Sequence, residues 1–134
     1  MPTTRIAMLL IPQMTQLDFT GPYEMFARAP DTVVELVWKD RCPVRSEFGL
    51  TILPTTTLAD ATQPDVIFVP GGRGVNPLLT DDEVVSWLRS AATRAKFVTS
   101  VCTGALILGA AGLLRGKRAT THWAYTQLLP LFGA

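Results

Sequence analysis

A cysteine stands where a predicted strand gives way to a predicted helix. Cys102 follows the β-rich apolar run 97–101 and precedes the small residues 103–105. A sharp strand-to-helix turn can present a nucleophile above a parallel sheet, and the helix N–H groups and dipole are expected to lower the thiol pKa. A cysteine in an apolar stretch can also be buried and inert, but the turn position favours a reactive thiolate. Cys42, in a polar loop, is interpreted as incidental.

A pair of glycines closes another apolar run. Gly71 and Gly72 follow Pro70 and the run 66–69. Such glycines are typical of a plain turn, which uses their freedom at positive φ. They also let backbone N–H groups point at a reaction centre, and the N–H groups of Gly72 and Thr103 could form an oxyanion-type hole for charge that develops on a bound substrate. The sequence leaves both interpretations open.

Two carboxyl groups lie near a predicted helix start. Asp18 could simply complement the helix dipole. It could also face Cys102 across the sheet rim and deliver a proton or orient water. Glu24 is the rival carboxyl, but it lies further into the helix and is expected to face solvent.

His122 is the only histidine of the chain. A Cys–His pair would be the obvious way to activate a thiol, whereas a histidine at a helix start can make a structural hydrogen bond, and both interpretations stand. One histidine and two separated cysteines do not favour a metal site. The Gly-rich segment 71–74 lacks the Lys-Ser/Thr of a phosphate loop, which argues against nucleotide binding.

Strands and helices alternate along the chain and must position these residues. Apolar runs predict strands at 6–11, 33–38, 66–69 and 97–101, a shorter strand at 48–53 in a hairpin with the stretch around Val44, and a short strand near 119–120. A first helix is predicted from Thr20 to near Pro30, with Pro22 in its first turn, and a second begins at a capping box of Thr80 and Glu83. A third helix is predicted over 103–114, with Gly116 as its terminator, and a fourth over about 123–131.

This alternation predicts an α/β fold. We expect a single domain over residues 1–134, built as a three-layer sandwich with a mainly parallel, flavodoxin-like sheet and helices on both faces. Ligands in such sheets bind at the carboxyl ends of the strands. Pro12, Gly71 and Cys102 all lie at predicted carboxyl ends, so three segments should converge on one rim.

Composition narrows the class of protein. The 134 residues are 48% hydrophobic and 17% charged, with a net charge of +1, which gives no electrostatic case for nucleic acid or membrane surfaces. No apolar run reaches the roughly 18 residues that span a bilayer. Two cysteines do not make a disulfide framework, and the first residues do not resemble a signal peptide. A reducing cytoplasm is therefore the expected compartment.

Taken together, these segments resemble the ThiJ/PfpI superfamily, the class I glutamine-amidotransferase-like α/β proteins. The resemblance rests on the Asp18 segment, on Pro70-Gly71-Gly72, and on segments 100–104 and 119–123. Within that superfamily, segments 17–22, 37–39 and 99–125 are similar to isonitrile hydratases.

The resemblance implies a reaction and roles for residues. The Cys102 thiolate would attack the terminal carbon of an isocyanide to give a thioimidate, and water would release an N-substituted formamide. Asp18 would be the acid/base carboxyl and Thr103 would assist, with His122 as a possible auxiliary group. The resemblance implies no cofactor, a small uncharged substrate and a mostly apolar pocket.

Two other functions stay open at this level. Ligand-sensing domains of transcription regulators share much of Cys-Thr-Gly and Thr-Thr-His-Trp, and the same thiol could serve redox sensing or detoxification of glyoxals. The resemblance also implies a homodimer. It further implies that the domain continues for several tens of residues past Ala134, so that this chain either is a fragment or is completed by a second chain, and an apolar, association-prone sheet edge is exposed.

Overall fold

Five strands pair into one sheet, and every pairing in it is parallel. The structure is a computed structural model that describes residues 2–134. The strands, in the spatial order β5-β2-β1-β6-β7, are β1 (Thr4–Leu9), β2 (Thr32–Trp38), β5 (Thr56–Thr57), β6 (Val66–Val69) and β7 (Phe97–Ser100). A separate antiparallel hairpin pairs β3 (Val44–Arg45) with β4 (Thr51–Ile52). The predicted mainly parallel sheet is thus confirmed.

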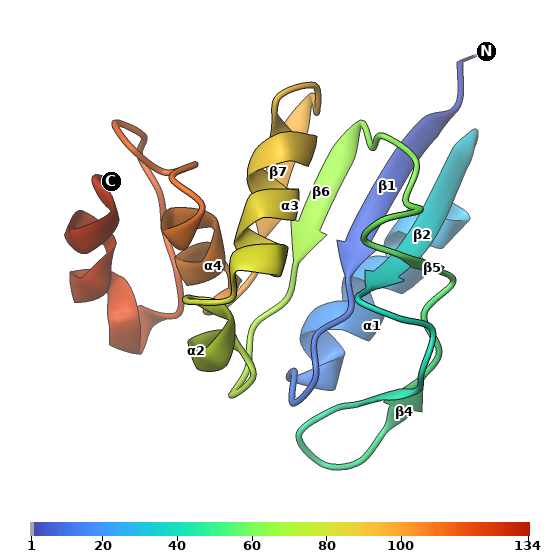
Figure 1. The fold of residues 1–134 in the computed structure, drawn as a ribbon, viewed down its shortest axis with the longest axis horizontal. Coiled ribbons are helices and arrows are strands. Elements are labelled where there is room, and N and C mark those ends of the chain that lie inside the picture. Colours follow the sequence, from blue (N-terminus) through green and yellow to red (C-terminus); the bar gives the residue numbers. More distant parts are fainter. Residues whose placement is uncertain (1) are drawn as a thin grey trace.

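Helices lie on both sides of this sheet. They are α1 (Gln16–Arg28), α2 (Val75–Leu78), α3 (Asp82–Ala92), α4 (Gly104–Ala110) and a 3-10 helix, η1 (Trp123–Phe132). Figure 1 shows α1 behind the sheet and α3 in front of it, which makes the predicted three layers. Within residues 2–134, no helix combines the length and apolarity needed to cross a membrane.

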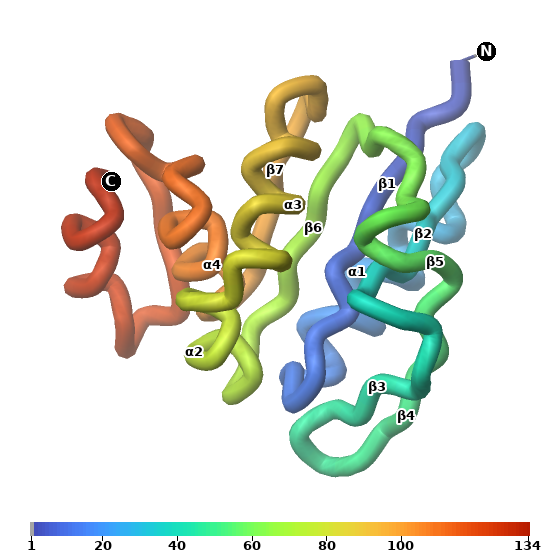
Figure 2. Tube along the Cα trace, in the orientation of Figure 1, coloured from blue at the N-terminus to red at the C-terminus, as the bar shows by residue number. Residues whose placement is uncertain are grey.

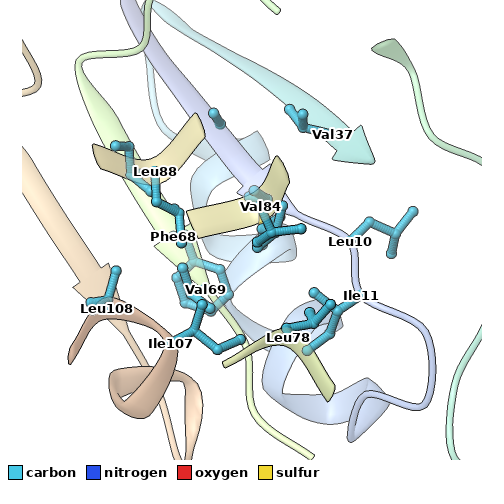
Figure 3. Packing of buried hydrophobic residues seen from close by; sticks show 14 of the residues in the cluster. Leu10, Ile11, Val37, Phe68, Val69, Leu78, Val84, Leu88, Ile107 and Leu108 are labelled. Carbon is cyan, nitrogen blue, oxygen red and sulfur yellow. The ribbon is translucent and has the colours of Figure 1, made fainter. Parts of the chain in front are cut away.

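The core explains why the central strands are apolar along their whole length. Met8 and Leu9 of β1 and Ile67 of β6 have no exposed surface, because helices cover both faces of these strands. Val84 and Leu88 of α3 lie over β6, as Figure 3 shows. The four-residue spacing of these two side chains places them on one face of the helix.

Several predicted boundaries are wrong, each for a local reason. α1 begins at Gln16 rather than near Thr20, so Pro22 lies inside the helix and leaves the carbonyl four residues earlier without its usual partner. The N-cap of α3 is Asp81, whose side chain accepts the Val84 N–H, and not Thr80 in a capping box with Glu83. An aspartate one residue later competes better for the same N–H groups.

The C-terminal third differs most from expectation. α4 ends at Ala110, because Gly112 takes a left-handed conformation with φ of 79° and turns the chain before Gly116 is reached. Residues 119–120 form no strand, and the predicted last helix is a 3-10 helix. Two short elements, β5 and α2, were not predicted at all.

The order of the strands creates a crevice. From β1 the chain moves to β2 on one side, and later returns to the other side of β1 to form β6. At such a reversal the loops after the two strands separate at their carboxyl ends. Here an isolated bridge between Met14 and Gly72 joins the loop after β1 to the loop after β6. The trace in Figure 2 shows both loops at the same end of the sheet, near α2 and α4.

Candidate active site

Cys102 stands in a strained turn directly after β7. Its φ of +51° lies in the left-handed region, which is costly for a residue other than glycine and common at functional turns. Thr121 fixes this turn, because its hydroxyl donates a hydrogen bond of 2.9 Å to the Cys102 carbonyl. The chain then enters α4 with Gly104, whose N–H donates to the Val101 carbonyl at 3.0 Å. The predicted strand–cysteine–helix turn is confirmed.

The glycine pair lies against this turn. A Cβ added to Gly71 would lie 2.7 Å from both the Cys102 Cβ and the Thr103 nitrogen, so only glycine fits there. Gly72, with φ of +124°, donates its N–H to Thr103 Oγ1 at 3.1 Å. The Gly72 N–H therefore already has a partner, and a bound substrate would have to compete with the Thr103 hydroxyl for it. The oxyanion-type hole stays a prediction.

Asp18 reaches the same place from the first turn of α1. Its negative charge is one of the influences that raise the pKa of the Cys102 thiol, so the carboxylate lies near the sulfur. The carboxylate oxygen Oδ2 is buried and accepts no hydrogen bond from the described residues. Buried oxygens are nearly always paired, so an unpaired one marks a place where a ligand or water is accommodated. Glu24, as predicted, is exposed and instead pairs with Arg28 Nε at 2.6 Å.

The thiol pKa moves opposite to the prediction. Burial is the largest influence and raises the pKa of Cys102 above its usual 9.0, and the Asp18 charge raises it further, while the Thr103 N–H and hydroxyl lower it only in part. The expected acidifying helix is short, since α4 has seven residues. Burial and the nearby carboxylate thus favour the thiol over the thiolate.

His122 has a structural bond and a place in the pocket. Its Nδ1 accepts the Ala124 N–H at 3.1 Å and so caps η1. Its ring also lies 5.4 Å from that of Trp123 and 5.7 Å from that of Tyr125. No hydrogen bond joins His122 to Cys102 among the described residues, so the structure favours the structural interpretation that the sequence left open.

A pocket of about 450 Å³ opens above Cys102. Its apolar wall comes from three helices, with Val75, Leu106 and Leu128. Its polar lining includes Thr103, Gly72 and His122, together with residues that the sequence analysis did not single out: Glu47, Arg73, Asn76 and Tyr125. Within residues 2–134, no cluster of three His, Cys, Asp or Glu side chains is arranged to hold a metal ion.

Glu47 could not be predicted as a pocket residue, because no local sequence pattern indicates that this hairpin packs against the carboxyl ends of the strands. The only available signal was a carboxylate between Ser46 and Gly49, in a segment predicted as a hairpin. Its relevance comes from tertiary structure, which brings the hairpin back against the loops after β1 and β6.

The chain is similar to known proteins along most of its length. Residues 4–133 match the DJ-1/PfpI family. An isonitrile hydratase of Pseudomonas putida is 59% identical over 130 residues, which cover 97% of this chain and 57% of that enzyme. The HTH-type transcriptional regulator CdhR of Pseudomonas aeruginosa is 31% identical over 86% of this chain and 35% of its own length.

Solved structures give the same fold. The crystal structure of a ThiJ/PfpI family protein from Pseudomonas syringae superposes with a TM-score of 0.96 and 43% identity, over 100% of this chain and 56% of that one. The chain thus spans little more than half the length of the hydratase and of this crystallised relative.

Proposed function

Because this chain belongs to the DJ-1/PfpI family, we propose that it acts as a cysteine-dependent isonitrile hydratase, which converts an isocyanide, R–N≡C, and water into a formamide, R–NH–CHO. One observation carries the proposal beyond family membership. The buried Asp18 oxygen without a partner lies on the carboxylate whose charge raises the pKa of the Cys102 thiol. A thiol and a free acceptor oxygen are the two groups that this addition needs.

The first step joins sulfur to the terminal carbon of the isocyanide. As Cys102 Sγ forms the new C–S bond, its proton passes to Asp18, and Asp18 then delivers that proton to the same carbon. The product is the thioimidate R–N=CH–S–Cys102. The raised thiol pKa suits this step, because the proton that the carbon must receive is still on sulfur at neutral pH.

The second step hydrolyses the thioimidate. Asp18 takes a proton from water as the water oxygen attacks the carbon, and then passes that proton to the nitrogen. The tetrahedral adduct R–NH–CH(OH)–S–Cys102 then collapses, with cleavage of the C–S bond, return of a proton to sulfur and release of the formamide. Thr103 assists both steps, because its N–H and hydroxyl lower the pKa of the Cys102 thiol and so favour the negative sulfur, and no cofactor is required.

The pocket fits a substrate of this class. An isocyanide carries no net charge, and its substituent can lie against Val75, Leu106 and Leu128 while its terminal carbon reaches Cys102. The small-molecule substrate is therefore proposed to have an apolar substituent.

Ligand sensing is the second candidate function. The similarity to a transcription regulator over most of the chain supports it. A sensor would need the pocket but would not need a proton-transfer group beside the thiol, and for this reason the hydratase is favoured.

The test measures N-cyclohexylformamide formed from cyclohexyl isocyanide. We expect Cys102→Ala to abolish turnover while its circular dichroism spectrum stays native, and Cys42→Ser, at the exposed cysteine, to retain it. The assay should use both residues 1–134 and the natural protein that carries them. Absence of turnover in both folded wild-type proteins would reject the hydratase and favour ligand sensing.

A further inference from the structure

We propose that Glu47 is a positioning residue that holds the two sides of the Cys102 site in register, the acid/base side with Asp18 and the backbone side with Gly72. The inference depends on the proposed function only for its kinetic readout. Glu47 belongs to the hairpin between β3 and β4, an element that takes no part in the reaction described above.

The Glu47 carboxylate is directed inward. Its side chain is 14% exposed, although the next residue, Phe48, is 92% exposed. One oxygen, Oε1, accepts a hydrogen bond of 3.0 Å from the Thr15 hydroxyl. The other, Oε2, accepts the Arg73 N–H at 3.1 Å and lies 3.8 Å from Arg73 Nε. One carboxylate thus joins the loop after β1 to the loop after β6.

The bond to Thr15 reaches the acid/base side. Thr15 is the N-cap of α1, yet its side chain does not cap the helix. A threonine in this position normally accepts an N–H from the first turn, whereas here its hydroxyl donates to Glu47. The Thr15 carbonyl accepts the Asp18 N–H at 3.0 Å. Glu47 therefore holds the residue on which the turn bearing Asp18 is built.

The bond to Arg73 reaches the backbone side. Arg73 directly follows Gly72, whose N–H donates to Thr103 Oγ1. The Thr15 N–H in turn donates to the Gly71 carbonyl at 3.0 Å, so the two loops also touch each other directly. Because Glu47 binds both loops, through Thr15 and Arg73, it limits how far Gly72 and Asp18 can move apart.

The hairpin presents Glu47 rigidly. Ser46 is buried, its Oγ accepts the Leu50 N–H at 3.1 Å, and its N–H donates to the Leu50 carbonyl at 2.9 Å. The Glu47 N–H donates to the Met14 carbonyl at 2.9 Å. Both main chain and side chain of Glu47 are therefore anchored to the loop after β1.

The decisive variant is Glu47→Gln, which keeps the size of the side chain but replaces one acceptor oxygen by an NH₂ group. That group cannot accept the Arg73 N–H or the Thr15 proton. We expect kcat for isocyanide hydration to fall about tenfold with KM changed less than about threefold, as for loss of one charged hydrogen bond that orients reacting groups. Thr15→Val should lower kcat by a similar factor, whereas Thr15→Ser should retain the wild-type kcat. In the double variant with Glu47→Gln and Thr15→Val, kcat should fall by a much smaller factor than the product of the two single factors.

Glu24→Gln is the matched control, because Glu24 also pairs with an arginine but lies on the exposed face of α1. It should change kcat less than about twofold. Amide hydrogen exchange gives a readout that does not need turnover. In Glu47→Gln, segments 13–18 and 71–75 should exchange faster, while β1 should not.

The outcomes separate the two proposals. Faster exchange of both segments in a protein that does not hydrate isocyanides would support the positioning role and reject the hydratase. Unchanged exchange with kcat within twofold of wild type would overturn the positioning role. A rise in KM with unchanged kcat would overturn it as well, since Glu47 would then contact the substrate instead.

Discussion

Cys102 and Asp18 are two acidic groups beside the substrate pocket, and both are negative when they lose a proton. The Asp18 carboxylate disfavours a negative sulfur at Cys102, and burial disfavours it more strongly. The pair is therefore suited to share a proton rather than to hold two negative charges. Activation of the thiol would then occur during the reaction and not before it.

This sharing predicts opposite effects from a single substitution. Asp18→Asn removes a negative charge, so the pKa of Cys102 should fall, and alkylation of the thiol by iodoacetamide at pH 8 should become faster. The same change removes the proton-transfer group, so hydration of cyclohexyl isocyanide should slow by about 100-fold or more.

Both rates would be measured in a Cys42→Ser background, so that only one thiol reacts, with Glu24→Asn as the control for loss of a carboxylate on α1. In wild type, the alkylation rate should keep rising to higher pH than for an ordinary exposed thiol, because burial raises the pKa of Cys102. Slower alkylation in Asp18→Asn would contradict the charge argument. An unchanged hydration rate would remove the acid/base role from Asp18.

At this scale, the sequence predicted which residues meet but not how they affect one another. Cys102, Gly71 and Asp18 follow strands or begin helices at one edge of a parallel sheet, and the strand pattern alone brings them together. The direction of the Cys102 pKa shift could not be predicted, because it depends on burial and on the place of one carboxylate. Glu47 could not be predicted either, since its contacts cross from a hairpin to two separate loops.

Among the elements, α3 is tied to the sheet through its first residues. Asp81 caps the helix by accepting the Val84 N–H at 3.2 Å, and its Oδ2 lies 2.5 Å from Lys39 Nζ just after β2. Partial burial, the largest single influence, raises the pKa of Asp81, but Lys39 and the helix N–H groups together lower it. A carboxylate with a lowered pKa stabilises the fold above that pKa and loses this effect as pH falls.

Asp81→Ala should therefore lower the free energy of unfolding at pH 7 by about 1–2 kcal/mol. The difference from wild type should shrink as the pH falls from 3.8, the ordinary pKa of the unfolded carboxyl, through the lower pKa of the folded one. Urea denaturation at several pH values measures both effects. Asp82→Ala, at an exposed carboxylate in the same turn, should cost much less, and an equal cost would contradict the capping role.

Element boundaries were harder to predict than element types. The run 66–69 matches β6 residue for residue because a buried strand must be apolar throughout. The start of α1 was misplaced because Pro22 was assigned to the first turn, whereas the helix begins after Thr15 and includes Pro22 in its interior. The helix over 103–114 was predicted too long, because the apolar pattern continues through Gly112, which turns the chain back.

At the scale of the whole molecule, β7 forms one edge of the sheet. Within residues 2–134 it pairs only with β6. Phe97, in its first position, is 64% exposed, and a groove of about 630 Å³ runs along the strand beside Leu113 and Leu114. An unpaired strand edge with apolar neighbours is a template for pairing with another chain.

Residues 1–134 should accordingly associate reversibly as their concentration rises, and Phe97→Lys should weaken that association because a charge on an edge strand opposes pairing. Sedimentation velocity over a range of concentrations measures this. Phe48→Lys, at an exposed phenylalanine of the β3–β4 hairpin outside this sheet, is the matched control. A discrete dimer unaffected by Phe97→Lys would instead assign self-association, including the predicted homodimer, to another face.

The left-handed backbone of Cys102 has an evolutionary consequence. A glycine at position 102 would adopt that conformation without the cost of about 1–2 kcal/mol that a side chain brings. Selection for thermal robustness alone would thus favour losing the sulfur from the lineage. Its retention would indicate continued selection for reactivity. The φ angle of Cys102 would then reflect a trade-off between stability and activity.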